Sequence, residues 1–363
     1  MIAKKPDTKT AEERSSSTDK KDHIRICIER DVESTLTNGF EKYYLINNPL
    51  PDMDFNDVNT ACTFLKKRIS APFMISPITG GYENSGRINK NLARAAQELG
   101  VIMSVGSQRL GLEDPSLAPT YQVRDVAPDI PLLANLGAIY LNYEYGLKEC
   151  QRAVDMINAD ALCLYLNPMQ KVFQGYENVN FKGLVEKIAH VCENLSVPVI
   201  VKEVGFGLSV DTALALEKAG AGLLDIAGAG GTTWTKITRF LKDETPDGLP
   251  ECFDNWGIPT ADALVAIRKA VGKIPLIASG GIRTGVEIAK AIALGADYAG
   301  MALPLVEPAM ISPLAVKDKI ARIITEFKMA MFSCGTRTVD QLKNGRLIGS
   351  IGSPMEPQSQ NLQ

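Results

Sequence analysis

Residues 275–304 read PLIASGGIRTGVEIAKAIALGADYAGMALP, and this stretch decides the fold. A short apolar run leads to the polar motif Ser279-Gly280-Gly281-Ile282-Arg283, an amphipathic segment follows as far as Gly295, and a second apolar run begins at Tyr298. Apolar runs without alternation are typical of parallel strands that are buried on both faces. A glycine after the last periodic residue is typical of the end of a helix. The stretch therefore predicts a strand, a crossover helix and a second, parallel strand.

The same unit recurs along the chain. Amphipathic stretches such as INKNLARAAQELG and VDTALALEKAG separate short apolar runs that are rich in β-branched residues. The runs begin near Ala71, Val101, Pro131, Ala161, Pro198, Leu223, Pro275 and Tyr298. Strands in this number, joined by helical crossovers, predict an α/β fold of the closed (β/α)8 type, the TIM barrel. The alternative is an open, doubly wound sheet.

The two ends of the chain differ in composition from its middle. Residues 1–19 are polar and rich in Lys, Thr, Ser and Glu, and residues 353–363 read the same way, so both are predicted to be flexible tails. Residues 20–352 are expected to form one barrel domain, in which residues 20–68 are an N-terminal cap. We expect residues 23–66 to cover the N-terminal end of the barrel. The Asp-, Pro- and Gly-rich stretch 239–259 is expected at the catalytic mouth.

Composition excludes several classes of function. A formal net charge of -3 gives no basic surface for nucleic acid or an anionic membrane, and no apolar run is long enough to span a bilayer. Seven cysteines without a C-x-x-C pair fit a reducing compartment, and the first residues carry no apolar segment of a secretory signal. With only His23 and His190, neither a Ser-His-Asp triad nor a histidine-rich metal site is plausible. We predict a cytoplasmic protein that acts on a small molecule.

The predicted strands end in polar and glycine-rich residues, at the end of the barrel where such enzymes carry their chemistry. After the seventh strand, Gly280 and Gly281 precede a helix, so bare backbone N–H groups and a helix N-terminus are expected to form a cradle for an anion. Barrels often bind phosphate with the loops after strands seven and eight. The alternative is that these glycines only make tight turns.

Lys202 follows five apolar residues at the end of the fifth predicted strand. An ammonium in a barrel mouth must meet an anion or a delocalised acceptor. A reduced flavin carries negative charge at its pyrimidine end, so Lys202 fits there; the alternatives are a Schiff-base lysine or an ion pair with Glu203. Thr79, Ser107 and Asn135 would then line the flavin edge as neutral hydrogen-bond partners.

A set of longer motifs extends over about residues 20–350. They are Thr79-Gly80-Gly81, Gly106-Ser107-Gln108-Arg109, Ala134-Asn135-Leu136-Gly137, Leu166-Asn167-Pro168, Val201-Lys202-Glu203-Val204-Gly205-Phe206-Gly207, Gly230-Gly231-Thr232, Trp256-Gly257-Ile258-Pro259-Thr260 and Ser279-Gly280-Gly281-Ile282-Arg283. Together they resemble the type 2 isopentenyl-diphosphate isomerases, which are FMN-dependent barrels. The resemblance implies a homo-oligomer, a tetramer or octamer, whose active form holds reduced FMN. It implies FMN contacts at Thr79, Ser107, Asn135, Lys202, Thr232, Gly280, Gly281 and Ala302.

The resemblance also implies a Mg2+-diphosphate site, and there the sequence departs from the family. Asp19 stands where the family has an arginine, and Tyr165 stands where it has a histidine. Lys171 and Thr238 each stand where the family has a glutamate. An ammonium cannot ligate Mg2+, so we predict no metal site and doubt a Mg2+ requirement. Gln170, which the family places beside the substrate for proton handling, is retained, and with Lys202 it forms the predicted catalytic pair. The predicted substrate-binding residues are Lys20, His23, Arg109, Tyr165, Asn167, Gln170 and Lys171.

Two explanations of these changes remain. In our main prediction the chain is an FMN-dependent flavoenzyme of this family that acts on an altered substrate without Mg2+, by proton or hydride transfer. In the other, Lys171 replaces the magnesium ion and pairs with the diphosphate, and the chain is a genuine isopentenyl-diphosphate isomerase of isoprenoid biosynthesis. A flavin-binding protein without catalysis is a third possibility, against which Gln170 and Arg109 argue.

Overall fold

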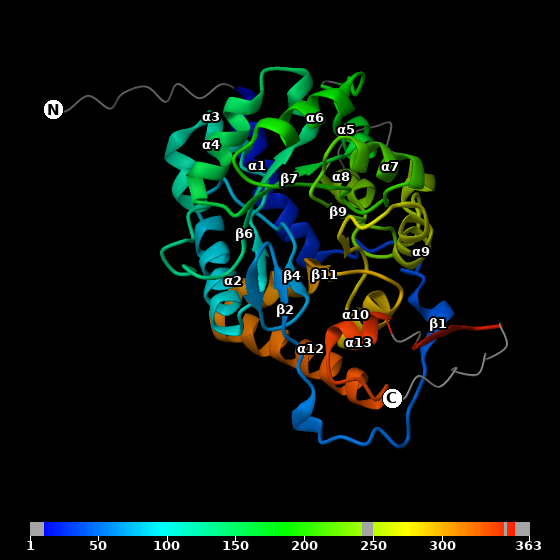
Figure 1. Ribbon diagram of the computed structural model, residues 1–363. Helices are drawn as coiled ribbons and strands as arrows, with labels where there is room; N and C mark the ends of the chain where they lie inside the picture. The colour runs from blue at the N-terminus through cyan, green and yellow to red at the C-terminus, as the bar shows by residue number, and fades with distance from the viewer. Residues whose placement is uncertain (1–10, 177, 242–249, 345–346, 353–363) are drawn as a thin grey trace.

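The barrel is closed. The computed structural model describes residues 11–176, 178–241, 250–344 and 347–352, with the side chains described from residue 20. Its eight parallel barrel strands are β4 (Phe73–Ile75), β5 (Ile102–Ser104), β6 (Leu132–Gly137), β7 (Ala161–Tyr165), β8 (Val199–Lys202), β9 (Leu223–Asp225), β10 (Leu276–Ala278) and β11 (Tyr298–Met301). The ring closes where β11 pairs with β4, Gly300 lying opposite Met74 (Figure 1). Each strand lies in one of the predicted apolar runs, so the TIM barrel is confirmed and the open sheet is excluded.

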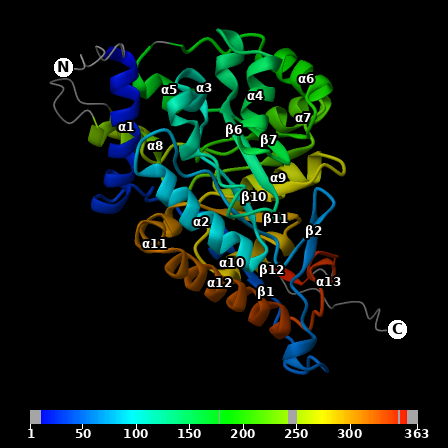
Figure 2. The same ribbon diagram turned by 90° about the vertical axis from the view of Figure 1, so that its left-hand side faces the viewer.

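Helices surround the strands (Figures 1 and 2). The principal ones are α2 (Ser85–Leu99), α4 (Leu147–Ile157), α6 (Leu184–Asn194), α7 (Val210–Lys218), α9 (Thr260–Ala270), α10 (Gly285–Ala293) and α12 (Pro313–Ser333). Their apolar stripes face the strands, and glycines in the left-handed region follow the helices as the sequence predicts: Gly100 (φ 62°), Gly220 (φ 84°) and Gly295 (φ 108°). The long helix α1 (Ala11–Glu29) precedes the barrel, and shorter helices are α3 (Arg109–Glu113), α5 (Pro168–Gln174), α8 (Trp234–Leu241), α11 (Val306–Ile311) and α13 (Val339–Asn344).

The ends of the barrel are covered by different segments. A hairpin of β2 (Cys62–Phe64) and β3 (Lys67–Ile69) closes the N-terminal end, where Phe64 and Ile69 pack on Met74 and Ile277. Of residues 23–66, which were expected to cover the N-terminal end of the barrel, only those in this hairpin do so. Helix α1 lies at the opposite end instead, packed against α8 and α11 (Figure 2). Sequence composition could not show this, because the position of α1 depends on long-range contacts.

Helix α1 also changes the predicted boundary of the N-terminal tail. It begins at Ala11, inside the stretch expected to be a flexible tail, because Ile24 (7% exposed) and Ile26 (3%) anchor its C-terminal half in apolar clusters. Once a helix has nucleated on buried residues, each added turn requires little more free energy. Residues 1–10 and the second predicted tail, 353–363, lie outside the described residues.

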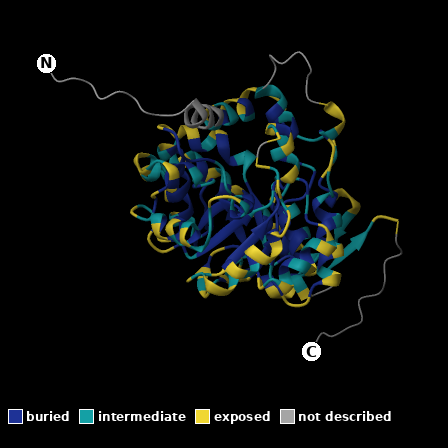
Figure 3. Cartoon of the chain, turned by 90° about the horizontal axis from the view of Figure 1, so that it is seen from above, coloured by how far each residue is buried: buried dark blue, intermediate teal, exposed yellow. Residues whose placement is uncertain are grey.

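The remaining elements join distant parts of the chain. Strand β1 (Tyr43–Leu45) pairs antiparallel with β12 (Ile348–Ser350). Buried residues concentrate between the strands and the helices, as the dark centre of Figure 3 shows. Short 3-10 helices complete the fold: η1 (Phe40–Lys42), η2 (Phe55–Asp57), η3 (Pro115–Thr120), η4 (Ala138–Asn142), η5 (Glu251–Phe253) and η6 (Leu303–Leu305). Among the described residues, no helix has both the length and the apolar character needed to cross a membrane.

Candidate active site

A cavity of about 570 Å³ opens at the C-terminal ends of the barrel strands. Residues that end or follow every barrel strand contribute to its wall, and α1 and α8 form the opposite side. The structure brings all the predicted site residues to this one cavity: Lys20, His23, Thr79, Ser107, Arg109, Asn135, Tyr165, Asn167, Gln170, Lys171, Lys202, Thr232, Gly280, Gly281 and Ala302. Their common location is what the barrel rule predicts for residues at strand ends.

The loop between β10 and α10 admits no side chain at its glycines. A Cβ atom at Gly280 (φ 101°) would lie 2.1 Å from the carbonyl oxygen of Gly228, and one at Gly281 (φ 75°) 2.2 Å from that of Gly230. Such a loop brings bare backbone to the cavity, which suits a phosphate group. Both glycines also line the cavity.

The N-terminus of α10, in contrast, is already satisfied from within the chain. Oε2 of Glu287 accepts hydrogen bonds from the amides of Arg283 (2.9 Å) and Thr284 (3.0 Å), and Glu326 accepts from the amide of Gly285 (3.0 Å). The amides of Arg283, Thr284 and Gly285 therefore have acceptors within the chain, and the predicted anion cradle is narrowed to the glycine loop. The capping box of Thr284 and Glu287 holds that loop in place.

Lys202 is 8% exposed at the end of β8 and has a carboxylate partner that the sequence analysis missed. Its Nζ donates to the carbonyl oxygen of Glu203 (2.5 Å) and lies 3.8 Å from Oδ2 of Asp225. Burial raises the pKa of Asp225, although Lys202 and the hydroxyl of Ser279, which donates to Oδ1 (2.6 Å), both act to lower it. The buried counter-charge of Lys202 is therefore Asp225, whose other carboxylate oxygen accepts from Ser279. An aspartate inside the apolar run LLDIAG was the signal that could have found it.

The carboxylate of Glu203 binds backbone amides and does not form the ion pair with Lys202 that was considered as an alternative. Its Oε2 accepts hydrogen bonds from four successive backbone amides, those of residues 204 (2.6 Å), 205 (2.7 Å), 206 (2.5 Å) and 207 (3.2 Å). Burial raises the pKa of Glu203 to about 7, against the effect of these amides. Glu203 thus fixes the shape of the loop after β8.

We expect Glu203→Ala to lower the free energy of unfolding by about 2 kcal/mol, because buried amides left without an acceptor cost about 1–3 kcal/mol. Urea unfolding would measure this, with Glu193→Ala, an exposed residue of α6, as the matched control. Glu203→Gln keeps one acceptor oxygen and should recover part of the loss. Equal stability of the two alanine variants would contradict this function of Glu203.

Several buried polar atoms in the mouth have no hydrogen-bond partner among the described residues. They are Oδ1 of Asn135 and of Asn167, Oγ of Ser76 and Nε2 of His23. Asn135 and Asn167 are 3% and 4% exposed. Buried polar groups are nearly always hydrogen-bonded, so unpaired ones that line a cavity point to a polar ligand. These residues therefore fit a flavin, whose ring edge offers several hydrogen-bonding atoms.

Helix α1 is fastened to the strand ends by Lys20. Its ammonium donates to the carbonyl oxygens of Gly80 (2.8 Å) and Ser107 (2.7 Å) and to the hydroxyl of Tyr121 (3.0 Å). Burial, with Arg109 nearby, lowers the pKa of Lys20 to about 7. An ammonium has three donors, and all three are used within the protein. Lys20 lines the cavity as predicted, but its contacts are those of a tether.

His23, one turn further along α1, contacts the ring of Trp234 edge-on, with the ring centroids 5.3 Å apart. Burial lowers the pKa of His23 to about 4, and the positive charge of Lys20 acts in the same direction. The imidazole is therefore neutral at physiological pH. Its unpaired Nε2 can accept or donate one hydrogen bond in the mouth.

Gln170 is buried at the start of α5, directly after β7. The side-chain amide of Asn167 donates to its Oε1 (2.9 Å), which fixes the plane of the Gln170 amide at the cavity wall. Asn167 and Gln170, both predicted to bind the substrate, thus form a hydrogen-bonded pair.

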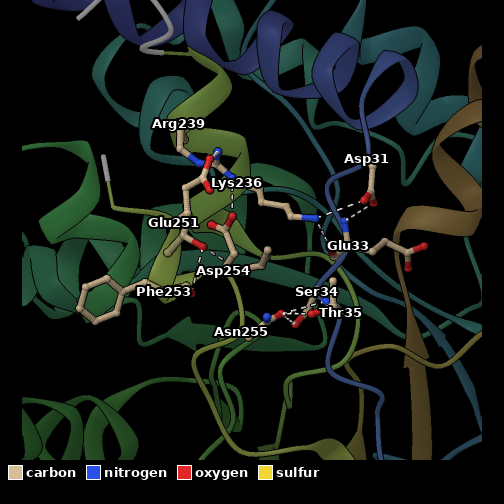
Figure 4. A network of polar contacts seen from close by, with 12 residues as sticks. Asp31, Glu33, Ser34, Thr35, Lys236, Arg239, Glu251, Phe253, Asp254 and Asn255 are labelled. Carbon is tan, nitrogen blue, oxygen red and sulfur yellow. Dashed lines mark hydrogen bonds and ion pairs between the residues drawn. The ribbon is translucent and has the colours of Figure 1, made fainter. Parts of the chain in front are cut away.

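A network of polar contacts joins the segment after α1 to helix α8 and to the loop that follows α8 (Figure 4). Lys236 of α8 contacts Asp31 (3.2 Å) and donates to the carbonyl oxygen of Glu33 (2.6 Å), while Arg239 pairs with Glu251 and Asp254. Oδ1 of Asn255 accepts from the hydroxyls of Ser34 and Thr35 and from the amide of Thr35, each at 2.9 Å. The loop expected at the mouth is therefore held by the segment after α1; its residues 242–249 lie outside the described residues.

Two cations of the mouth share one aromatic ring, that of Tyr140 in η4. Nζ of Lys171 lies 5.2 Å from the ring centroid and 3.4 Å from the hydroxyl oxygen, and the guanidinium of Arg109 lies 5.5 Å from the centroid. Arg109 also pairs with Glu113 (2.7 Å). Tyr165 donates to Oγ of Ser107 (3.2 Å), and burial raises the pKa of its phenol. Tyr140 is not among the predicted site residues, because nothing in its local sequence indicates that the neighbouring strand ends bring cations to it.

The comparisons with known proteins agree with this site. The sequence pattern of the FMN-dependent dehydrogenase family matches residues 166–348. The isopentenyl-diphosphate delta-isomerase of Nostoc sp. is 45% identical to this chain over 92% of the chain and 96% of that protein. The chain belongs to the type 2, FMN-dependent isopentenyl-diphosphate isomerase family. The proteins of the same name from Rickettsia felis and Oceanobacillus iheyensis are 44% and 42% identical, over 90% and 93% of this chain and 95% and 97% of their own lengths.

Solved structures share the fold of this isomerase-family chain. A mandelate oxidase variant with an FMN adduct superposes with a TM-score of 0.65 at 19% sequence identity, over 94% of this chain and 99% of its own. A lactate oxidase of Pediococcus acidilactici gives a TM-score of 0.63 at 17% identity, over 92% and 91%. At these identities the likeness concerns the barrel alone. Family membership, together with the cradle and the unpaired polar atoms, makes the chain an FMN-dependent enzyme.

The metal site that the resemblance to this isomerase family implies does not fit the residues present. In the part of the chain that the structure describes, no three or more His, Cys, Asp or Glu side chains gather as a metal would require. Lys171 lines the cavity in place of one glutamate. Thr238, in place of the other, donates its hydroxyl hydrogen to the carbonyl oxygen of Trp234 (2.8 Å). The absence of hard oxygen ligands at these positions is a property of this sequence.

Proposed function

We propose that this chain catalyses the interconversion of isopentenyl diphosphate and dimethylallyl diphosphate with reduced FMN. The observation that carries the proposal is that one cavity gathers the predicted flavin-binding residues together with the cations Arg109 and Lys171. The chain is also 45% identical to a relative named for this reaction. Identities of 42–45% over nine-tenths of the chain favour this alternative over our main prediction of an altered substrate. The altered substrate is supported only by the substituted positions, Lys171 and Thr238 among them.

The residues that would hold FMN fall into groups according to the part of the cofactor that each would contact. The loop of Gly280 and Gly281, with Ala302 after β11, would hold the phosphate, and Lys202 would face the pyrimidine end of the ring. Thr79, Ser107, Asn135 and Thr232 would supply hydrogen bonds at the ring edge and ribityl chain. The bound flavin would supply a ring that takes up a proton from one carbon of the substrate and returns a proton to another.

The chain itself would position the substrate and exclude water. Gln170, oriented by Asn167, would lie beside the reacting carbons and hold a proton in transit, while the neutral His23 would offer a hydrogen bond. The interconversion is redox-neutral, because one C–H bond breaks and another forms while the double bond moves. Helices α1 and α8 cover the mouth and would keep bulk water from the allylic carbons.

The test begins with the purified protein. Heat-released flavin should be FMN, and the protein reduced with dithionite without oxygen should convert isopentenyl diphosphate into dimethylallyl diphosphate, followed by NMR. The oxidised protein serves as the control and should be inactive. If the reduced, FMN-loaded protein does not convert isopentenyl diphosphate, the proposal is wrong and the prediction of an altered substrate is favoured.

Two further expectations concern the protein in the cell. We propose that it is cytoplasmic and that it forms a homo-oligomer, a tetramer or octamer, as the family resemblance implies. Light scattering after size-exclusion chromatography measures the second of these directly.

A further inference from the structure

Three residues from consecutive strand ends form a cationic wall in the mouth. Arg109 begins α3 after β5, Tyr140 lies in η4 after β6, and Lys171 lies in α5 after β7. Both cations approach the Tyr140 ring, at 5.5 Å and 5.2 Å from its centroid, and all three residues line the cavity. We call these three residues the cation–tyrosine clamp. Attraction to the ring face holds the two positive charges near one another at the cavity wall.

Only one of these charges is matched by a carboxylate. Glu113 pairs with Arg109 (2.7 Å) and also accepts from the hydroxyl of Tyr145 (3.2 Å). Among the described residues, Lys171 makes no ion pair, and its hydrogen-bond partner is the neutral hydroxyl of Tyr140 at 3.4 Å. The other carboxylates near the mouth are engaged as well: Asp225 lies beside Lys202, and Glu33 pairs with Arg283. The clamp therefore carries an unmatched positive charge.

This arrangement suits an anion better than a divalent cation. Mg2+ takes hard oxygen ligands, and the nearest carboxylate to the clamp, Glu113, already has a guanidinium as its partner. A diphosphate, in contrast, needs several positive charges once water is excluded. Arg and Lys both bind phosphate oxygens directly, Arg through paired N–H donors and Lys as a point charge.

We propose that Arg109 and Lys171, held at the ring of Tyr140, bind the diphosphate of the substrate directly, without a divalent metal ion between protein and substrate. The inference rests on the proposed function, since that function supplies a diphosphate substrate. It goes further by assigning the charge that neutralises the diphosphate to this chain's own side chains.

Isothermal titration calorimetry of the FMN-loaded protein with inorganic pyrophosphate tests the clamp. Bound FMN keeps the probe out of the glycine loop. Pyrophosphate should bind in EDTA, and MgCl2 should not strengthen the binding. Lys171→Gln should weaken binding in EDTA at least tenfold, Lys171→Arg should retain most of it, and Lys218→Gln, at an exposed position of α7, should leave it unchanged. An unaltered flavin spectrum and melting temperature would show that the variants fold, and Arg109→Gln offers a second, independent variant.

The outcomes separate the clamp from the proposed function. Binding that requires Mg2+, or that is the same in Lys171→Gln as in the unmodified protein, overturns the clamp whatever the catalytic result. Binding in EDTA that depends on Lys171, in a protein that does not isomerise isopentenyl diphosphate, supports the clamp and overturns the proposed function. Isomerisation that persists in EDTA and falls at least tenfold in kcat/KM in Lys171→Gln supports both.

Discussion

Gly280→Ala should yield a protein without flavin, with FMN affinity reduced by more than about 100-fold, or about 3 kcal/mol. The added Cβ would lie 2.1 Å from the carbonyl oxygen of Gly228, a backbone atom that cannot rotate away. The residue also has a φ of 101°, which L side chains rarely adopt. The loop must therefore move, and the cradle for the phosphate is lost with it. Flavin absorbance of the purified protein and fluorescence titration with FMN measure the change.

Gly272→Ala is the matched control for this substitution. At Gly272 the nearest atom to an added Cβ is a side-chain oxygen of Glu217 at 3.5 Å, which is an ordinary contact. That variant should purify with its flavin. Stoichiometric FMN in a folded Gly280→Ala protein would show that the phosphate lies elsewhere in the mouth.

Gln170→Ala should lower kcat for the isomerisation by about 10²–10⁴-fold, the usual contribution of a positioned proton-transfer group. Gln170 is buried, its amide plane is fixed by Asn167, and it lies on the cavity wall at the end of β7. Initial rates with reduced enzyme, measured over a range of isopentenyl diphosphate concentrations, would separate kcat from KM.

Gln174→Ala provides the comparison, because Gln174 lies one turn later on α5, lines the same cavity and is exposed. We expect that variant to change kcat by less than about threefold. FMN content should be the same in both proteins. Equal losses of kcat in the two variants would show that α5 acts only through packing and that the proton is held by another group.

The sequence predicts the barrel because its strands are buried on both faces. A strand of this kind reads as an unbroken apolar run, so the run at Pro275 and the run at Leu223 both coincide with strands of the ring. The same regularity places residues such as Asn135 and Lys202 at one end of the barrel without any knowledge of distances. The predicted site residues therefore lie together, although their individual roles stay predictions.

What the sequence could not show depends on contacts between segments far apart in the chain. Tyr140 acquires its two cations from the neighbouring strand ends, and Lys20 reaches Gly80 and Ser107 only because α1 crosses the mouth. Local composition favoured a cap at the other end of the barrel. Asp225 is an intermediate case, since a carboxylate in an apolar run indicates a buried partner but does not say which cation it meets.

The pairing of β4 with β11 has a consequence for the way this protein is made. Met74 lies opposite Gly300, so β4 leaves the ribosome long before its partner has been synthesised. During that time one side of the half-built ring presents unpaired N–H and C=O groups, which are a template for association with other chains. A nascent or truncated polypeptide that stops before Tyr298 retains this open edge, however well its first βα units have packed. We therefore expect the yield of native protein to depend on how well this open edge is shielded until the last barrel strand emerges.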